Sequence, residues 1–299
     1  MKTVIFDGQK AGRKIGEKLK TKLEKLKKQG KIPSLVSILV GDNLASKIYL
    51  KKKKEFAARI GLDFKTFYFQ PNEIKKIKRT IGDLNCDQNV GGIMVQLPLP
   101  DDWLAKDKLT VLNLISPEKD VDCLTAFNLG RLFLGQPLYL PATVLAIKKI
   151  LQLAGLNKNN ILGKNACVVG KSSLIGKPTA ILLTNMGATV TVCHRQTKDL
   201  IGYTAKADIL ISATGQPNLI NGRMVKKGAI AIDVGSPKPD FDFKSVSKKA
   251  KFITPVPSGV GPMTVACLME NFLQSISGNS FLFADQNIKL AGKAAKDEF

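Results

Sequence analysis

The sequence predicts an α/β protein made of two domains, each built on a parallel β-sheet. Three observations indicate this fold class. Helical and strand patterns alternate along the first third of the 299-residue chain, a second alternating series begins near residue 166, and a segment rich in proline and glycine at 116–142 separates the two. Such alternation is typical of parallel sheets, because each parallel connection crosses back through a helix. The chain is also long enough for two ordinary domains with buried cores.

In the first third, apolar residues either repeat with the period of a helix or form short continuous runs. A lysine-rich helix is expected over 8–29, where leucine and isoleucine recur on one face. Ser34–Val40 is an apolar run ended by Gly41, so we expect a buried strand. The following expected elements are a helix at 43–60, a strand at 63–69, a helix at 72–84 and a strand at 92–97 that stops before Pro98.

The second series follows the same alternation after a loop-like connector at 116–142. Its expected elements are a helix at about 143–154, a strand at 166–169, a helix at 176–186, a strand at 188–193, a helix within 197–206, strands at 208–212 and 229–234, and an apolar helix after Pro262. The tail from about Ser277 is expected to be weakly ordered.

Composition indicates a soluble, cytoplasmic protein. No apolar run reaches the roughly 18 residues that a membrane-spanning helix needs, and the apolar segment near the N-terminus is too short for a signal peptide. The five cysteines form no C-x-x-C pair, and His194 is the only histidine. Neither a disulfide framework nor a zinc site is therefore expected. We expect no metal and no membrane partner.

The net charge of +22 first suggests a nucleic-acid-binding protein. The lysines cluster on helical segments, however, and are not interleaved with aromatic residues. This arrangement favours solvated helix faces, so no nucleic-acid partner is expected. The positive field would still attract anionic substrates such as polyglutamates and phosphates.

A strand-to-helix turn at 167–176 is the candidate nucleotide site. Gly170, Lys171, Ser172 and Gly176 stand where backbone amides and a helix N-terminus would favour an anion. The usual dinucleotide fingerprint has glycine in place of Ser172, so a tight turn without a ligand stays an alternative. A Walker A motif is rejected, because Asn165 occupies the position of its first glycine.

The end of the next strand carries His194 and Arg195. Enzymes that use NAD often have an acidic residue there, which binds the ribose hydroxyls. A cation at this position suits the 2′-phosphate of NADP instead, and Lys171 would add a second one. An exposed loop charge is the alternative interpretation of Arg195.

A second candidate site lies in the first third. Ser46, Tyr49 and Lys53 share one helix face, and a phenol and an amine one turn apart suit substrate binding and proton transfer. The adjoining lysines are expected to lower the pKa of Lys53. A solvated helix face is the alternative. Gln96 ends a strand, where ligands gather in open α/β sheets.

Two aspartates, Asp120 and Asp122, lie in the connector, and turn aspartates are the alternative reading of both. The rigid segment 255–264, rich in proline and glycine, suggests a ligand wall or a domain junction.

Several segments together resemble one family, the methylenetetrahydrofolate dehydrogenase/cyclohydrolase family, called FolD in bacteria. The match extends from about Val40 to Asn271. Its signatures are Gly41-Asp42-Asn43 with Ala45-Ser46, Tyr49 and Lys53; Val95-Gln96-Leu97-Pro98-Leu99-Pro100; Pro117-Glu118-Lys119-Asp120-Val121-Asp122; Val169-Gly170-Lys171-Ser172 with Gly176 and Pro178; and Thr254-Pro255-Val256-Pro257 through Thr264.

The resemblance implies a folate-binding catalytic domain at 1–142, completed by a C-terminal helix at 263–299, and a Rossmann-like, NADP-binding domain at 143–262. A cleft would separate them. The catalytic residues would be Lys53, Tyr49, Gln96 and Asp122. The substrate-binding residues would be Ser46, Tyr49, Lys53, Gln96, Leu97, Pro98, Asp122 and Pro262. The cofactor-binding residues would be Gly170, Lys171, Ser172, Ile175, Gly176, His194, Arg195, Thr214, Gly215 and Thr264.

The implied function is NADP-dependent oxidation of 5,10-methylenetetrahydrofolate to 5,10-methenyltetrahydrofolate, followed by hydrolysis to 10-formyltetrahydrofolate in one-carbon metabolism. Lys53 would move the protons of the hydrolysis, Gln96 would orient it, and Asp122 would hold the pterin ring. The substrate would be a polyglutamylated folate. We also expect a homodimer formed through the second domain, where the apolar strands at 188–193 and 208–212 would offer an edge or face.

The chain departs from the family pattern at Cys123 and Ser258, which replace glycines, at Ala142 and Val144, which replace cysteine and proline, and at Ser236. If residue 123 needs a positive φ, cysteine costs roughly 1–2 kcal/mol there. Two alternatives stay open: a monofunctional NAD(P)-dependent dehydrogenase of the same fold without cyclohydrolase activity, and a basic nucleic-acid-binding protein with a vestigial nucleotide fold.

Overall fold

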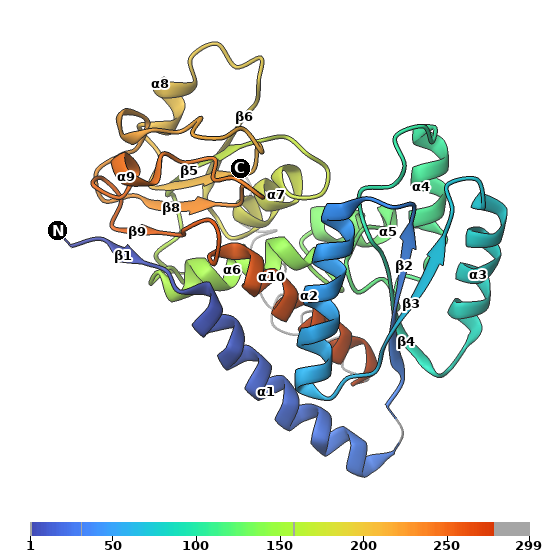
Figure 1. The fold of residues 1–299 in the computed structure, drawn as a ribbon. Coiled ribbons are helices and arrows are strands. Elements are labelled where there is room, and N and C mark those ends of the chain that lie inside the picture. The colour runs from blue at the N-terminus through green and yellow to red at the C-terminus, as the bar shows by residue number, and fades with distance from the viewer. Residues whose placement is uncertain (1, 31, 158, 278–299) are drawn as a thin grey trace, which may run out of the picture. The chain divides into compact units, whose positions relative to one another are not determined.

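A computed structural model describes residues 2–30, 32–157 and 159–277 (Figure 1). The chain divides into two compact units. The large-sheet unit comprises residues 1–14 and 141–267, and the small-sheet unit comprises residues 15–140 and 268–299. Two helices, α1 (Gly8–Gln29) and α10 (Val260–Ile276), contribute to both units. Among the described residues, no helix is long and apolar enough to cross a bilayer.

The small-sheet unit is built on three parallel strands with β2 (Ser34–Val40) in the centre, flanked by β3 (Phe64–Phe69) and β4 (Val90–Val95). Every residue of β2 is buried, as expected for a strand covered on both faces. Its even-numbered residues pack against α3 (Ile74–Cys86) and α4 (Ala105–Asn113). Figure 1 draws α3 on one side of this sheet and α2 (Leu44–Ile60) on the other.

The last turns of α10 fasten onto the small-sheet unit through side chains. Asn271, which is 1% exposed, donates from Nδ2 to the carbonyls of Val121 and Leu140, both at 2.8 Å. Ser275 donates to the carbonyl of Gly91 in β4 at 2.8 Å. These bonds place the last turns of α10 on the sheet that residues 15–140 form.

The large-sheet unit contains six parallel strands in the order β1-β9-β8-β7-β5-β6. Their bounds are β1 Val4–Ile5, β5 Asn165–Val169, β6 Thr189–Cys193, β7 Ile209–Ser212, β8 Ile230–Asp233 and β9 Phe252–Ile253. Its helices are α6 Ala142–Leu153, α7 Gly176–Asn185, α8 Leu200–Thr204, α9 Phe243–Val246 and the 3-10 turn η1 Gly222–Met224. The chain winds outward from β5 to β6 and then returns to β7, so the strand order reverses between β5 and β7. Ligands of open α/β sheets bind at the carboxyl ends of such a switch point.

The predicted fold class is confirmed, but the unit boundaries differ from the expected ones. Residues 1–14 were expected in the first domain, yet β1 pairs with β9 of the large sheet, with Val4 opposite Phe252. A two-residue strand carries no periodicity, and only its long-range partner defines it. The change between units also falls at 140–141 and at 267–268, instead of at 142–143 and 262–263.

The expected helices and strands are present within a few residues of their predicted ends, and six short or irregular elements were missed. The segment 116–142 is not wholly a loop, because it contains α5 (Ala126–Phe133), whose N-cap Thr125 accepts a hydrogen bond from the Asn128 amide. The other missed elements are α4, α9, η1, β1 and β9. The tail beyond Ser277 lies outside the described residues.

Candidate functional site

Lys53 is a buried cation of the small-sheet unit. It lies on α2 and is 8% exposed, and its Nζ donates to Oε1 of Gln96 at 3.0 Å and approaches Sδ of Met94 at 3.8 Å. Lys51 and Lys52 are exposed, because the helical period turns them away from the sheet. The solvated-face interpretation therefore applies to these neighbours and not to Lys53.

Burial lowers the pKa of the Lys53 ammonium, and the charge of Asp122 opposes this by raising it. From the sequence, the adjoining lysines were expected to lower this pKa. That cause is wrong, since desolvation dominates. An amine with a lowered pKa is more easily deprotonated near neutral pH and is suited to move protons.

Ser46 and Tyr49 lie on α2, as Lys53 does, and Gln96 directly follows β4. Ser46 is 1% exposed and donates from Oγ to the carbonyl of Leu97 at 3.1 Å. Gln96 also donates to that carbonyl, from Nε2 at 2.9 Å, so its Oε1 is turned toward Lys53. Tyr49 is half-buried, and the ammonium of Lys52 lies 5.6 Å from its ring centroid. Leu97 is half-buried and Pro98 is exposed at the end of the strand.

The two aspartates of the connector have different surroundings. Asp120 is 1% exposed and accepts from the amides of Leu124 and Thr125 and from Nδ2 of Asn128, at 2.9 to 3.0 Å. It is a turn aspartate in the loop that precedes α5. Asp122 is half-buried, and its charge acts on Lys53. Of the two, only Asp122 thus belongs with the candidate catalytic residues.

Cys123 follows Asp122 with φ of 56°, in the left-handed region that favours glycine. It is fully buried, and its Sγ lies 3.2 Å from the carbonyl of Tyr139. Tyr139 in turn donates to the carbonyl of Glu118 at 2.7 Å. These contacts hold the loop at 118–123, and with it the backbone of Asp122.

The turn between β5 and α7 has the glycine geometry of a phosphate-binding turn. Gly170 has φ of 120°, and a side chain at Gly176 would bring its Cβ to 1.9 Å from the carbonyl oxygen of Gly170. Ser172 accepts from the amides of Ile175 and Gly176, both at 3.2 Å, and so caps α7. Lys171 is exposed. The backbone of the turn is therefore closely packed at Gly170 and Gly176, whereas the side chain of Lys171 is exposed to solvent.

His194 and Arg195 follow β6 at the same edge of the large sheet. The Nδ1 of His194 accepts from the Gln196 amide at 3.3 Å, so this nitrogen is committed to the turn. Arg195 is exposed and has no hydrogen bond or ion pair to another residue of the described ranges. The guanidinium of Arg195 is therefore available to a phosphate.

Thr214 and Gly215 follow β7, across the switch point. The hydroxyl of Thr214 donates to Oδ2 of Asp240 at 2.9 Å and accepts from the Gln216 amide at 3.1 Å. Gly215 is exposed, with φ of 67°. Pro262 and Thr264 lie in the first turns of α10, in the large-sheet unit, where Thr264 donates to the carbonyl of Val260 at 3.2 Å.

Family models match almost all of the chain. Residues 6–122 match the tetrahydrofolate dehydrogenase/cyclohydrolase catalytic domain, and residues 141–280 match the NAD(P)-binding domain of the same family. A bifunctional protein FolD from Nitratiruptor sp. is 45% identical over 280 residues, which cover 91% of this chain and 97% of that protein. The chain belongs to this family.

Solved structures agree with that assignment. A crystal structure of the bifunctional enzyme FolD from Campylobacter jejuni is 41% identical, with a TM-score of 0.88 over 93% of this chain and 99% of that one. The Trypanosoma brucei FolD, solved with NADP cofactor and an inhibitor, is 34% identical, with a TM-score of 0.87 over 93% and 99% of the two chains. The family predicted from the sequence motifs is therefore confirmed.

Several residues of these sites carried no recognised sequence signal. Met94 and Tyr139 are ordinary apolar residues in the sequence, and Asn271 stands in an apolar helix. Asp233 is the last residue of β8, and Asp240 lies in the loop after it. No sequence motif marks either residue as part of a site. No group of three or more His, Cys, Asp or Glu side chains within the described ranges is placed to hold a metal ion.

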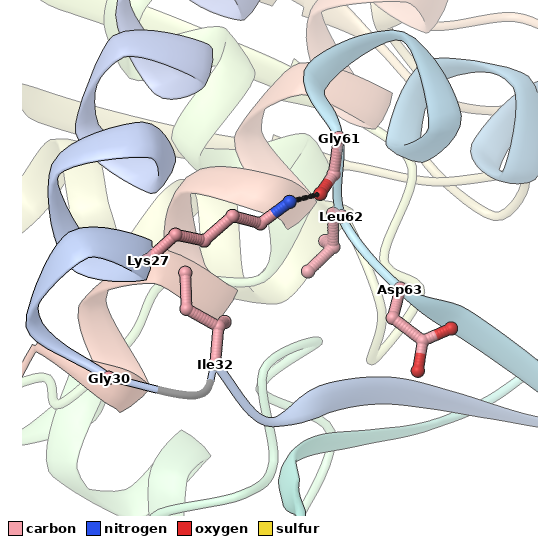
Figure 2. A pocket seen from close by; sticks show the side chains of 6 residues that line it. All are labelled: Lys27, Gly30, Ile32, Gly61, Leu62 and Asp63. Carbon is pink, nitrogen blue, oxygen red and sulfur yellow. Dashed lines mark hydrogen bonds between the residues drawn. The ribbon is translucent and has the colours of Figure 1, made fainter.

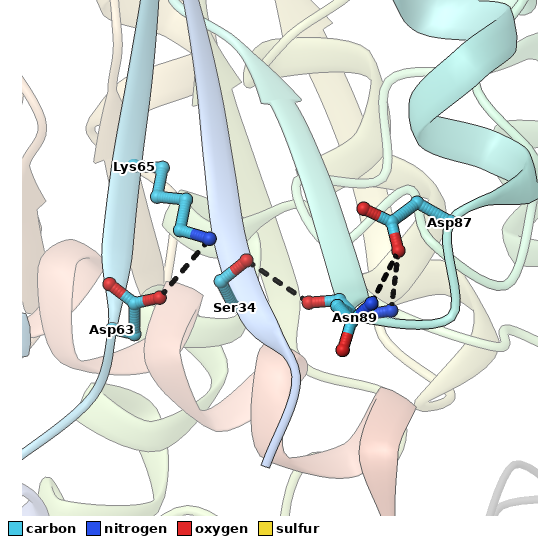
Figure 3. Close-up of polar contacts among 5 residues, drawn as sticks. All are labelled: Ser34, Asp63, Lys65, Asp87 and Asn89. Carbon is cyan, nitrogen blue, oxygen red and sulfur yellow. Dashed lines mark hydrogen bonds and ion pairs between the residues drawn. The ribbon is translucent and has the colours of Figure 1, made fainter. Parts of the chain in front are cut away.

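A cavity of about 290 Å³ lies elsewhere in the small-sheet unit, beside the amino end of β3 (Figure 2). The Nζ of Lys27 donates to the carbonyl of Gly61 there at 2.6 Å, and so completes the end of α2. Figure 3 shows further polar contacts at the same ends of the strands, including Asp63 with Lys65 at 3.6 Å. None of the predicted site residues is among those that line this cavity. The candidate catalytic residue Gln96 follows the opposite, carboxyl end of β4.

Proposed function

We propose that the protein catalyses NADP-dependent oxidation of 5,10-methylenetetrahydrofolate to 5,10-methenyltetrahydrofolate and the hydrolysis of that product to 10-formyltetrahydrofolate. The observation that carries this proposal is the buried Lys53 beside Gln96 and Asp122, in a chain with both domains of the family. The relatives that support it are named as bifunctional proteins, and the match to this chain covers nearly their whole length.

Lys53 is the proton carrier of the hydrolysis. Its ammonium is buried, so the neutral amine becomes accessible at a lower pH than for an exposed lysine. Gln96 fixes the amine through a 3.0 Å hydrogen bond and is itself held by the carbonyl of Leu97. Asp122 favours the protonated form, so its charge opposes the effect of burial on the ammonium, and this balance suits a group that accepts a proton and then releases it.

The large-sheet unit fits a dinucleotide. Gly170 and Gly176 allow the tight turn that a phosphate requires, and Gly215 leaves open space where a Cβ would stand. NADP, when bound, supplies the acceptor for the hydride. The protein's own contribution is to hold the two reactants in register and to exclude water from the reacting carbon.

Arg195 selects NADP over NAD in this proposal, with Lys171 as a second cation. Both side chains are exposed, and no acidic residue occupies the end of β6 to repel a 2′-phosphate. A charge-assisted contact is worth about 1.5–3 kcal/mol, so losing one should reduce the preference roughly ten- to a hundredfold. The expected result is a kcat/KM ratio for NADP over NAD that falls in Arg195→Ala and falls further with Lys171→Ala added. An unchanged ratio in the double variant would refute the assignment.

The experiment that tests the activity is incubation with 5,10-methylenetetrahydrofolate and either NADP or NAD. Reduced coenzyme and the absorbing methenyl product are followed together. A bifunctional enzyme produces reduced coenzyme without lasting methenyl absorbance. Accumulated methenyl product would instead establish the monofunctional dehydrogenase, and binding of DNA at physiological ionic strength without turnover would favour the nucleic-acid-binding alternative.

We propose a homodimer that forms through the large sheet. Of the two strands that the sequence suggested for this contact, only β6 is suitably placed. β6 is an edge strand of the large sheet, and its Val192 is 39% exposed, whereas β7 lies between β8 and β5 and offers no free edge. A second copy pairing along β6 would cover this edge. Light scattering should give twice the 32.5 kDa chain mass at micromolar concentration. A monomer mass would exclude the dimer.

The cellular setting follows from the same chemistry. We place the enzyme in the cytoplasm, in the tetrahydrofolate interconversions that supply purine, methionine and histidine synthesis. The net charge of +22 favours polyglutamylated folates, which carry several carboxylates. The KM for a polyglutamate should be lower than for the monoglutamate, and added salt should reduce that difference.

A further inference from the structure

Asp240 is a buried carboxylate that the proposed reaction leaves without a role. It is fully buried in the large-sheet unit, between β8 and α9. Its Oδ2 accepts three hydrogen bonds: from Oγ of Ser212 at 2.7 Å, from the amide of Thr214 at 2.7 Å and from the hydroxyl of Thr214 at 2.9 Å. Burying a carboxylate is costly unless its partners are well placed, so a specific structural or functional requirement is expected.

The position of Asp240 is itself determined by its neighbours. The carboxylate of Asp233 accepts from the amides of Gly235, Asp240 and Phe241, at 2.8 to 3.2 Å. A Cβ at Gly235 would stand 2.8 Å from Oδ1 of Asp240, so only glycine permits the close approach. The segment 233–241 therefore presents the Asp240 carboxylate in one orientation.

The turn that Asp240 holds lies directly against the phosphate-binding turn. Ala213 donates from its amide to the carbonyl of Val169 at 2.8 Å. A Cβ at Gly170 would stand 2.5 Å from the carbonyl oxygen of Ala213. The two turns that follow β5 and β7 are thus packed together at the switch point, where a dinucleotide binds in this class of sheet.

These bonds also change the role of Thr214. Its hydroxyl hydrogen and its amide are both given to Asp240, and the hydroxyl accepts from Gln216. The side chain therefore has no proton left to donate to a coenzyme. Gly215, next along the chain, has φ of 67°, and apart from its two chain neighbours no described residue has a heavy atom within 4 Å of its ideal Cβ position. The open side of this turn is the backbone at Gly215.

We propose that Asp240 is a positioning residue for the coenzyme, which holds Ser212 and Thr214 so that the backbone at Gly215 lines the NADP site. The inference rests on the proposed function for the identity of the coenzyme. The carboxylate acts through the turn and does not touch the coenzyme. Thr214 is accordingly a strut between Asp240 and Gln216, and not a side-chain ligand.

The test is calorimetric titration of the full-length protein with NADP, using Asp240→Ala, Asp240→Asn and Ser212→Ala. Asp240→Ala removes three hydrogen bonds and should weaken NADP binding about ten- to a hundredfold. Asp240→Asn keeps one acceptor oxygen and should show a smaller loss. Ser212→Ala removes one of the three bonds and should weaken binding about three- to tenfold. Asp242→Asn, whose side chain makes no capping bond to α9, is the matched control and should bind NADP as the wild type does.

Hydrolysis of methenyltetrahydrofolate, which consumes no coenzyme, separates positioning from loss of structure. The expected result is weakened NADP binding with hydrolysis retained within about twofold. Wild-type NADP affinity in Asp240→Ala, or a parallel loss of binding and hydrolysis, would overturn the inference. If Asp240→Ala does not fold, Ser212→Ala decides between these outcomes. Wild-type protein that binds NADP but hydrolyses no methenyltetrahydrofolate would contradict the proposed function alone.

Discussion

Burial makes Lys53 chemically different from the lysines beside it in α2. Residues 51 to 54 are all lysine, yet only Lys53 is buried, and its ammonium alone among them contacts Gln96. Water solvates the ammonium groups of Lys51 and Lys52, whereas removal of water from Lys53 lowers its pKa. Its position on the helix thus gives Lys53 the lowered pKa that the proposed proton carrier requires.

We predict that Lys53→Met abolishes cyclohydrolase activity and preserves the fold. Methionine has a similar length and a high helix propensity, and it buries well against Met94. The measurements are hydrolysis of methenyltetrahydrofolate and thermal unfolding. Lys51→Met, at an exposed position, is the control and should hydrolyse at the wild-type rate. Wild-type hydrolysis by Lys53→Met would remove this residue from the mechanism.

Cys123 stands where the family has glycine, and its backbone does adopt a positive φ, of 56°. A residue with a Cβ costs roughly 1–2 kcal/mol in this region, and glycine does not. Burial raises the pKa of its thiol, so the thiol stays protonated and acts as an apolar group.

We predict that Cys123→Gly is at least as stable as Cys123→Ala, by up to about 1 kcal/mol. Both variants lose the Sγ contact with Tyr139, but only glycine relieves the backbone. The relief of roughly 1–2 kcal/mol exceeds the roughly 0.4–1 kcal/mol that glycine loses to unfolded-state entropy. Urea unfolding of the two variants compares them directly. An alanine variant clearly more stable than the glycine variant would show that the left-handed backbone is not strained.

At the scale of elements, α10 belongs to both units of the chain. Its first turns contain Pro262 and Thr264 of the large-sheet unit, and its last turns hold the connector of the small-sheet unit through Asn271. The Asn271 bond to Val121 reaches the residue immediately before Asp122. Although α10 is apolar along most of its length, it carries Asn271 at the position where the carbonyls of Val121 and Leu140 need a hydrogen-bond donor.

We predict that Asn271→Ala lowers the free energy of unfolding by about 2–3 kcal/mol, because it leaves two buried carbonyls without their donor. The KM for the folate substrate should rise more than kcat falls, since the backbone next to Asp122 loses a fixed point. Urea unfolding and steady-state kinetics measure the two effects. Asn72→Ala, at an exposed position, is the matched control and should change stability by less than about 0.5 kcal/mol. Equal stability of the two variants would contradict the anchoring role.

For the whole molecule, the buried carboxyl group of Asp233 links stability to pH. Burial raises the pKa of Asp233 to about 6, and the charge of Asp240 adds to the rise, while three backbone amides oppose it. The protonated form is therefore favoured in the folded protein. This contribution to stability is fully present below the ordinary pKa of 3.8 and is lost as the pH rises through about 6.

We predict that Asp233→Asn flattens the dependence of stability on pH between about 4 and 7. The difference between 3.8 and about 6 corresponds to about 3 kcal/mol, at about 1.4 kcal/mol for each pKa unit. An amide does not titrate, so the variant should lose that slope even where its absolute stability is lower. Urea unfolding of both proteins across this pH range makes the comparison. Parallel slopes would show that Asp233 does not titrate there.

The sequence by itself determined the order and type of the main elements and the family. The periods of apolar residues are local signals, and so are Gly170 and the motif residues around Lys53 and Asp122. These signals depend on residues within one or two turns of each other, so they can be read along the chain without knowing what packs where. The same holds for Asp120, whose role as a turn aspartate was one of the two readings offered by its local sequence.

Only the tertiary structure decided which partners lie far apart in the chain. It pairs β1 with β9, brings Asn271 to Val121 and Asp240 to Thr214, and buries Lys53 among lysines that stay exposed. The pKa of Lys53 depends on desolvation, which no local pattern encodes, because the water is excluded by segments distant in sequence. Local sequence motifs thus identify the candidate site residues, whereas contacts between distant segments determine their positions and the pKa of Lys53.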